Sequence, residues 1–233
     1  MLLQLFFFKI IVRNLILLAL KDAQKPYLQG LLANTPESQH THVKNQCDFH
    51  LNSLAEFCLN DYKVTGLLTT DFIRGLHRTM LPHDYIMLEG TEFKTLPGEY
   101  RLFQAVHPSY LNPGQITSFF IPEQIATGMT LAVNNINTKL LATTDTLEMQ
   151  DAIFIFLIDF LAIHPFADAN GRVACILADL LAIRSGLKPL YFHSIKTNDK
   201  IALYQAIELV TVNQDFTLAR EMFLRYKKER TAQ

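Results

Sequence analysis

The stretch HPFADANGR, residues 164–172, interrupts a long apolar region of the chain. It follows DAIFIFLIDFLAI and precedes VACILADLLAI, and both runs are apolar enough to be buried helices. The nine residues between them hold a histidine, a carboxylate, an amide, a glycine and an arginine. We therefore expect a helix, a polar loop that carries the chemistry, and a second helix.

The start of the second helix is suited to bind an anion, because its first N–H groups lack partners and the helix dipole adds positive charge. Asn170 and Arg172 can contact a phosphate through their side chains, and Gly171 lets the backbone approach it. Asp168 would repel that phosphate unless a cation such as Mg²⁺ lies between them. His164 can accept a proton from an attacking hydroxyl.

Each half of the stretch also has an ordinary structural interpretation. His-Pro-Phe is typical of a helix end, and Asp-x-Asn-Gly is typical of a turn. The combination of a base, an acid, an amide, a glycine and an arginine in nine residues is much more specific. Phe166 is interpreted as the apolar pin that fixes the loop to the core.

The composition narrows the class of protein. The chain has 233 residues, a net charge of −1 and 49% hydrophobic residues, which supports one sizeable core without a basic nucleic-acid face. Cys47, Cys58 and Cys175 show no CxxC spacing, so we expect buried thiols and a reducing compartment.

Residues 1–22 form an apolar N-terminal segment that contains Lys9 and Arg13. A charge at the centre of a bilayer costs about 2.5–3.5 kcal/mol, so a membrane span is disfavoured. The following KDAQKP supplies no convincing cleavage site for a signal peptide. A packed helix and a peripheral membrane contact through residues 1–20 remain open.

The rest of the chain is predicted to be mainly helical. Residues 23–47 are polar with two prolines and a glycine, which indicates a linker, and residues 227–233 are interpreted as a C-terminal tail. The expected strands are EYRLFQAV (99–106) and QITSFFI (115–121), separated by a loop. Helical spacing predicts helices near 48–59, 70–81, 123–136, 146–163 and 170–185, and two more from a cap at Asn198 onward.

HPFADANGR matches HxFx[D/E][G/A]NGR, the signature of Fic (Fido-fold) proteins, at every specified position. LHRTM (76–80), PGEYR (97–101) and the segment around Tyr204 also resemble the surrounding Fic pattern, so that the resemblance covers residues 48–226. It implies an all-α Fido fold with a small β-hairpin, the flap, that positions a target segment.

The resemblance further implies a protein adenylyltransferase, which transfers AMP from ATP to a Ser, Thr or Tyr hydroxyl of a target protein. His164 would be the general base and Asp168 the Mg²⁺ ligand. By position, the nucleotide-binding residues would be Ala169, Asn170, Gly171 and Arg172, the structural residues Pro165 and Phe166, and the flap residues Tyr100, Arg101, Ile116 and Phe119. The cytoplasm, or a host cell entered after secretion, is the expected compartment, and a homo-oligomer stays open.

Two departures from the family pattern concern the donor. Cys175 stands where a second arginine usually orients the terminal phosphate of ATP, and Ala169 replaces the more frequent glycine. Both departures resemble Doc, a relative that transfers phosphate, although Doc has lysine at the position of Gly171. Transfer of phosphate, UMP or phosphocholine, and a Fido binding module without turnover, are therefore kept as alternatives. Thr217-x-x-x-Glu221 matches the family's inhibitory helix motif only loosely.

Overall fold

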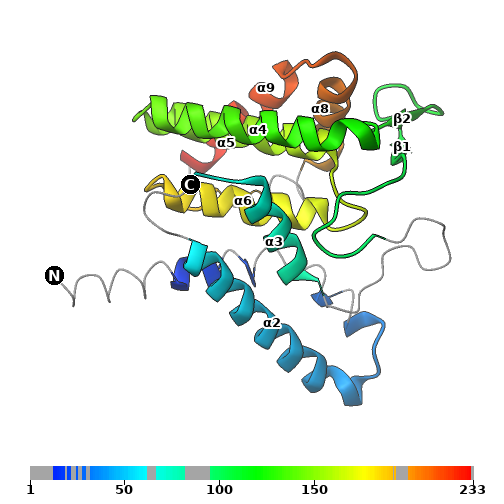
Figure 1. Cartoon of the computed structure of the whole chain (residues 1–233), viewed down its shortest axis with the longest axis vertical. Helices are drawn as coiled ribbons and strands as arrows, with labels where there is room; N and C mark the ends of the chain where they lie inside the picture. The colour runs from blue at the N-terminus through cyan, green and yellow to red at the C-terminus, as the bar shows by residue number, and fades with distance from the viewer. Residues whose placement is uncertain are drawn as a thin grey trace.

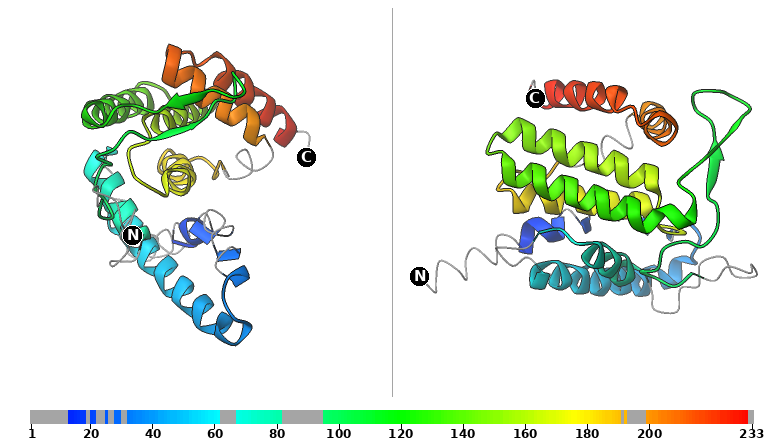
Figure 2. Two further views of the ribbon diagram at one scale, coloured as in Figure 1. Left: turned by 90° about the vertical axis from the view of Figure 1, so that its right-hand side faces the viewer. Right: turned by 45° about the horizontal axis from the view of Figure 1, so that its top comes forward.

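Two apolar helices, α5 (Thr146–Ile163) and α6 (Asn170–Arg184), form the centre of the molecule. The computed structural model describes residues 13–18, 20–21, 25, 28–29, 32–61, 67–81, 95–190, 192 and 199–231. Side chains of α6 from Val173 to Ile183 are buried on every face, which explains why this stretch reads as continuously apolar. Figure 2 shows α6 between α5 and the helices of the N-terminal half.

The remaining elements surround this pair (Figure 1). Helix α5 contacts α4, α6, α8 and α9, and α3 contacts α2, α4 and α6. The predicted all-α class with one small sheet is confirmed in the part of the chain that is described. The other elements are η1 (Glu37–Gln39), α2 (His40–Asp61), α3 (Thr70–Met80), β1 (Val106–Pro108), β2 (Ile116–Ser118), α4 (Pro122–Ala142), α8 (Lys200–Asn213) and α9 (Thr217–Thr231).

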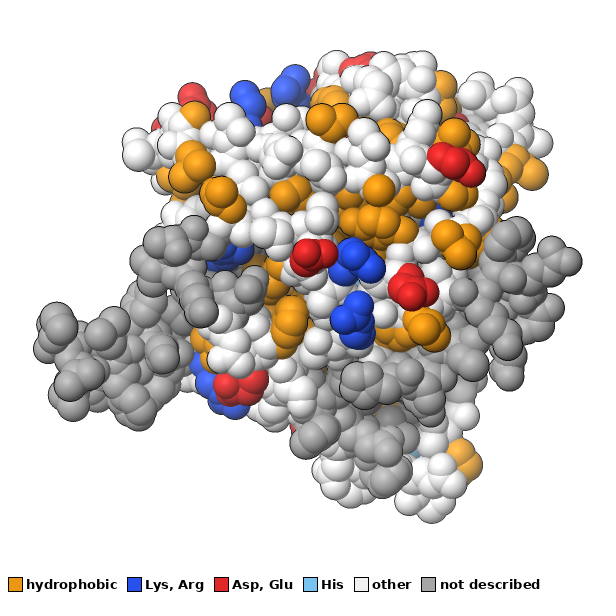
Figure 3. All heavy atoms as spheres, viewed as in Figure 1, with side chains coloured by type: hydrophobic (Ala, Val, Ile, Leu, Met, Phe, Trp, Pro, Cys, Tyr) orange, Lys and Arg blue, Asp and Glu red, His pale blue; other side chains and the backbone are white. Residues whose placement is uncertain are grey.

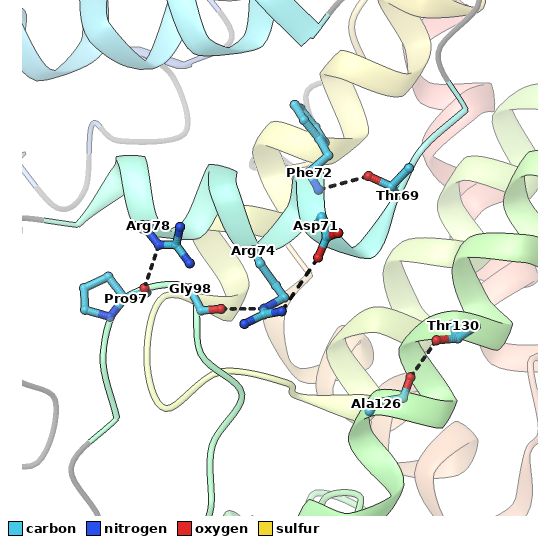
Figure 4. Close-up of polar contacts among 9 residues, drawn as sticks. All are labelled: Thr69, Asp71, Phe72, Arg74, Arg78, Pro97, Gly98, Ala126 and Thr130. Carbon is cyan, nitrogen blue, oxygen red and sulfur yellow. Dashed lines mark hydrogen bonds and ion pairs between the residues drawn. The ribbon is translucent and has the colours of Figure 1, made fainter.

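Local side-chain chemistry sets several of these boundaries. Thr69 caps α3 by accepting the Phe72 N–H at 3.0 Å (Figure 4), and Asp145 caps α5 by accepting two backbone N–H groups. Pro122 begins α4, where its missing N–H costs no hydrogen bond. The Asn137 amide bonds both the N–H and the carbonyl of Leu68 at 2.8 Å, which fixes the entry to α3 against α4.

Three predicted boundaries need correction. The expected linker over 23–47 is partly helical, because α2 begins at His40, whose ring nitrogen contacts the carbonyls of Leu32 and Thr35 at 3.0 and 2.9 Å. Helix α9 continues to Thr231, so residues 227–231 are not a tail. The predicted cap at Asn198 lies outside the described residues, and Asp199 is the N-cap of α8.

The second strand is shorter than predicted, and the first is shorter and begins at the last residue of its predicted range, so that His107 and Pro108 lie in a strand and not in the loop. The two strands cover 106–108 and 116–118 and pair antiparallel, with Val106 opposite Ser118. Residues 99–105 do not join the sheet, because Arg101 uses its N–H and its side chain to bind other segments, as described below. The hairpin therefore stands on an irregular stem and projects from the helical layers beside α8 (Figures 1 and 2).

The surface carries both charged and apolar side chains. On the face drawn in Figure 3, acidic and basic side chains are dispersed between apolar patches, in line with the net charge of −1. Within the described residues, no helix combines the length and the apolar character needed to cross a bilayer. The predicted membrane contact through residues 1–20 lies mostly outside the described part of the chain.

Candidate functional site

The loop of residues 164–169 is bracketed by two residues in the left-handed region of backbone space. His164, the C-cap of α5, has φ 51°, and Ala169, the N-cap of α6, has φ 63°. This conformation costs a residue with a Cβ about 1–2 kcal/mol, so surrounding contacts must hold it. Strain of this kind, concentrated in one short loop, is typical of functional sites.

Asn170 braces the loop from inside. Its Oδ1 accepts the Phe166 N–H at 3.0 Å, and its Nδ2 donates to the Phe166 carbonyl at 2.8 Å. Both ends of the buried amide are therefore engaged with the backbone of Phe166. This refines the prediction for Asn170, because its side chain holds the backbone of Phe166, and the groups left to face a phosphate are its backbone N–H and the second N–H of Nδ2.

Phe166 is fully buried, as its predicted structural role requires, and its ring stacks on His77 of α3 with centroids 3.9 Å apart. His77 Nδ1 accepts the Gly98 N–H at 2.8 Å, so its proton lies on Nε2, which is 3.2 Å from the Asp168 carbonyl. Burial is the main reason why the pKa of His77 falls to about 4. His77 is therefore a neutral clamp between α3, the 97–98 turn and the loop.

The turn at Pro97 and Gly98 is held from the same helix. Arg74 Nε donates to the Gly98 carbonyl at 2.8 Å, and Arg78 Nε donates to the Pro97 carbonyl at 3.3 Å (Figure 4). Gly98 has φ +87°, and a Cβ there would lie 2.8 Å from the Arg74 carbonyl oxygen, so only glycine fits. Tyr100, which follows the turn, tilts against Phe166 and lies under the Arg74 guanidinium.

Arg101 is buried at the base of the flap, with 1% of its surface exposed. Its guanidinium donates to the carbonyls of His164 (2.7 Å), Phe103 (2.6 Å) and Phe120, and its backbone N–H donates to the Pro165 carbonyl at 2.9 Å. The sequence suggested that Arg101 helps the flap to position a target. Its side chain is instead buried and is not available to contact a target. It ties the stem of the flap to the strained end of α5, and its positive charge lies next to the His164 backbone.

His164 is the partly buried group around which the site is built. Its imidazole stacks on Phe119, which follows β2, with ring centroids 4.0 Å apart. Burial, together with the charges of Arg101 and His107, lowers its pKa to about 4, against a smaller opposing effect of the Leu161 backbone and of Asp168. The ring is therefore neutral at pH 7 and able to accept a proton.

The start of α6 follows the other end of the loop, at Ala169. Ala169 supplies no side-chain cap, so the first N–H groups of the helix keep their positive field. Arg172 Nη2 lies 3.4 Å from Asp168 Oδ2, and the Asp168 side chain is 48% exposed. The arginine predicted to bind phosphate and the carboxylate predicted to bind a metal thus lie beside each other at the helix start.

Asp168 could bind a magnesium ion if the phosphates of a nucleotide supplied further ligands. Among the described residues, no group of three or more histidine, cysteine or acidic side chains could hold a metal by itself. Mg²⁺ commonly uses one or two protein carboxylates and completes its shell with phosphate oxygens and water. Asp168 is the accessible carboxylate beside the helix start, so the site suits a metal that arrives with a nucleotide.

The flap presents two different faces. His107, Thr117 and Phe119 turn inward, whereas Ile116 is 73% exposed on the outer face together with Val106. His107 donates from Nδ1 to the Pro108 carbonyl at 2.7 Å, which leaves Nε2 as an acceptor beneath the hairpin. Of the predicted flap residues, Ile116 is therefore outward, Phe119 covers His164, and Tyr100 and Arg101 lie at the base.

The two edges of the hairpin differ in what they can bind. Because 107 and 117 form a hydrogen-bonded pair, the backbone groups of Ile116 and Ser118 point away from β1. On the other edge Pro108 has no N–H to offer. The outer edge of β2 is consequently the better one for pairing with an added strand.

Cys175, one of the two departures from the family pattern, and Glu221, from the loosely matched inhibitory motif, fall in different places. Cys175 is 2% exposed within the apolar side of α6, which agrees with the expected packed thiol. Glu221 is exposed on α9, where the neighbouring Arg220 lies 4.0 Å from Asp151 in the first turns of α5. Asp151 precedes His164 by thirteen residues, or about 20 Å along a helix, so Glu221 is remote from the site.

Sequence reasoning missed His77 as a loop clamp and Glu208 as a contact of the flap. LHRTM drew attention to His77 only as part of a family pattern. A glutamate amid the apolar positions of IALYQAIELV is the signal that could have singled out Glu208, because buried carboxylates need partners.

Comparisons with known proteins agree with this geometry. The model of the Fic/DOC family matches residues 67–182, which include the whole loop and the flap. A search of curated proteins returned no match. Similar solved structures include a Fic domain containing signaling protein from Bacteroides thetaiotaomicron, with 24% identity, a TM-score of 0.55, and coverage of 78% of this chain and 70% of that one.

Two further similar structures extend over nearly the whole chain. A Fic family protein from Desulfovibrio desulfuricans has 14% identity and a TM-score of 0.56, and the match covers 96% of this chain and 65% of that one. IbpAFic2, solved covalently tethered to Cdc42, has 17% identity and a TM-score of 0.54, with coverage of 94% and 62%. At these identities the similarity shows a shared fold. The present chain spans about two thirds of the length of each of these two proteins. On the match to the family model, with its signature intact at residues 164–172, the chain belongs to the Fic/DOC family.

Proposed function

We propose that this protein is a Mg²⁺-dependent transferase that moves AMP from ATP to a hydroxyl group of a target protein. The Fic family generally transfers nucleotide or phosphate groups. The observation that carries the proposal is a neutral imidazole, His164, six residues before an uncapped helix start that also bears Arg172. A base at one end of a six-residue loop and an anion site at its other end supply the two parts that phosphoryl transfer needs.

The residues act in the following order in this proposal. The backbone N–H groups at the start of α6 and the Arg172 guanidinium bind the nucleotide phosphates. Asp168 would hold Mg²⁺, which when bound offsets the negative charge of the phosphates. Binding of the nucleotide then separates Arg172 from Asp168, because each gains a partner of opposite charge.

The transfer step uses His164 as the base. Its imidazole accepts the proton of the target hydroxyl while the hydroxyl oxygen bonds to the α-phosphorus. The bond from that phosphorus to the bridging oxygen breaks, and pyrophosphate leaves. A histidine with a lowered pKa is a weak base in the free enzyme, but the negative charge of a bound nucleotide favours the imidazolium that forms.

The flap would supply the target segment to His164. The free edge of β2 offers backbone groups of Ile116 and Ser118 for strand addition, a common mode of peptide recognition. Phe119 directly follows that strand and contacts the His164 ring, so a segment paired with β2 runs toward the base. IbpAFic2, which is similar in fold, has been solved covalently tethered to the protein Cdc42, which supports a protein target here.

Transfer of the γ-phosphate is the second candidate, because of Cys175. That buried thiol replaces the arginine that the family uses to orient the terminal phosphate, so the donor can bind in another direction. Transfer of UMP, transfer of phosphocholine and loss of turnover are the remaining alternatives, and the experiment below distinguishes them.

The position of the label decides between these donors. The protein is incubated with Mg²⁺, a cell lysate, and ATP labelled at the α- or, separately, the γ-phosphate. Protein-bound label from the α-position alone supports the proposal. Label from the γ-position alone supports phosphate transfer. If ATP gives no label, transfer from labelled UTP or CDP-choline supports UMP or phosphocholine as the transferred group. Nucleotide binding without any transfer supports a binding module.

A further inference from the structure

The flap is too small to be stable by itself. Its strands have three residues each, and an isolated two-stranded hairpin is marginal even when longer. Arg101 holds the stem of the flap by binding the carbonyls of Phe103 and Phe120. The far end, which comprises the joining loop 109–115 and Thr117, needs an anchor of its own.

That anchor is a single buried carboxylate on α8. Glu208 is 2% exposed, and both of its oxygens are directed at the hairpin. Oε1 accepts the hydroxyls of Ser109 (2.5 Å) and Thr117 (2.7 Å), and Oε2 accepts the N–H groups of Tyr110 (2.7 Å) and Leu111 (3.2 Å). One side chain therefore binds β2 through Thr117 and the joining loop through Ser109, Tyr110 and Leu111.

Neighbouring side chains of α8 make the same docking surface. Tyr204, one turn before Glu208, stacks on Tyr110 with ring centroids 4.7 Å apart and planes within 10°. Gln205 Nε2 donates to the Tyr110 carbonyl at 3.2 Å. Although burial alone would raise the pKa of Glu208, its four hydrogen bonds lower it below the ordinary value, so the group is ionised at neutral pH.

We propose that Glu208 is a positioning residue that fixes the inner face of the flap on α8 and thereby preforms the outer edge of β2 for a target segment. Glu208 and Tyr204 bind the inward Thr117 and the joining loop, while Ile116 and Ser118 stay outward. An edge that is already ordered binds a strand with a smaller loss of conformational entropy. The role in target capture rests on the proposed function, but the anchoring does not.

Hydrogen exchange tests the anchoring without reference to activity. Glu208→Gln keeps the shape of the side chain, but it replaces one of the two acceptor oxygens with an NH₂ and removes the negative charge that strengthens all four hydrogen bonds. We expect the amides of Tyr110 and Leu111 to exchange at least about tenfold faster in this variant, while α5 keeps its protection. Glu221→Gln, an exposed glutamate on α9, is the matched control. Unchanged exchange over residues 105–119 would overturn the inference.

The transfer assay tests the consequence. With labelled ATP and graded dilutions of the lysate that supplies the acceptor, Glu208→Gln should raise the apparent KM for the acceptor about tenfold and change kcat much less. Glu208→Asp, which retains the carboxylate, should recover part of the loss. A fall in kcat with an unchanged KM, in a variant whose flap exchanges faster, would contradict the positioning role.

A second pair of variants keeps the inference testable if Glu208→Gln does not fold. Ser109→Ala and Thr117→Val each remove one donor and leave the carboxylate with three partners, so each should loosen the flap less than Glu208→Gln does. The two proposals fail differently. If wild-type protein transfers no group, the proposed function is wrong and the exchange data alone decide whether Glu208 anchors the flap.

Discussion

The phenyl ring of Phe119 lies nearly parallel to the imidazole of His164, with 4.0 Å between ring centroids and 14° between planes. Phe119 directly follows β2 of the flap, and His164 is the C-cap of the central helix α5. The contact therefore joins the segment proposed to receive a target to the proposed base. It also shields the imidazole from water, and burial is the largest cause of its low pKa.

Removing this ring should raise the pKa of His164. In Phe119→Ala the imidazole becomes more hydrated, so its charged form costs less and its pKa should move from about 4 toward the ordinary 6.5. NMR titration of the imidazole resonances measures this directly. The acidic limb of kcat/KM should move to higher pH by the same amount. Phe103→Ala, at the stem, is the control, and an unmoved titration in Phe119→Ala would refute the shielding effect.

Asn170→Asp should weaken the fold. The carboxylate can still accept the Phe166 N–H, but it cannot donate to the Phe166 carbonyl, which is left facing a negative charge. A buried acceptor without its donor costs about 1–3 kcal/mol in the free energy of unfolding. Urea denaturation measures the loss, with Asn135→Asp on the exposed side of α4 as the control. Equal midpoints for both variants would mean that the clip contributes little.

The helices and the loop could be predicted because their signals are local. Caps such as Thr69, and apolar spacing in α5, depend on residues within a few positions. The roles of Arg101 and Glu208 could not be predicted, because their partners lie up to 63 and 99 positions away in sequence. For Asn170 the residue type was consistent with two roles, and only the fold shows that its amide faces Phe166.

A proline at the free edge of the flap should block target binding. Ile116→Pro removes an outward N–H from β2 without breaking a bond to β1, so transfer to protein should fall about tenfold or more. Val106→Pro makes the same change on the β1 edge, which Pro108 already blunts, and should reduce transfer by less than about threefold. The comparison uses labelled ATP at one lysate concentration. Equal losses in both variants would exclude β2 as the docking edge.

Asp159 should make the protein less stable as pH rises. It lines a groove of about 890 Å³ between α4, α5 and α9, and burial raises its pKa from 3.8 to about 6. Between these values the folded state binds more protons than the unfolded state, so stability falls as pH increases through this window. Asp159→Asn should therefore stabilise the protein at pH 8 by roughly 1–2 kcal/mol, allowing for partial exposure, and have little effect near pH 4.

Thermal unfolding at several pH values tests this prediction. Asp151→Asn is the matched control, since Asp151 lies near Arg220 on the same groove and has a cationic neighbour. A stabilisation by Asp159→Asn that is equal at pH 4 and pH 8 would show that the effect does not come from ionisation of the carboxyl.

The central claim is that a neutral His164 removes a proton from the target while the start of α6 binds the nucleotide. It is tested most directly by comparing wild type and His164→Ala for transfer of α-labelled ATP to protein and for ATP affinity by calorimetry, both with Mg²⁺. We predict that transfer falls at least about a hundredfold while ATP affinity stays within about threefold, because the base contacts the hydroxyl and not the phosphates. Undiminished transfer by His164→Ala would contradict the account.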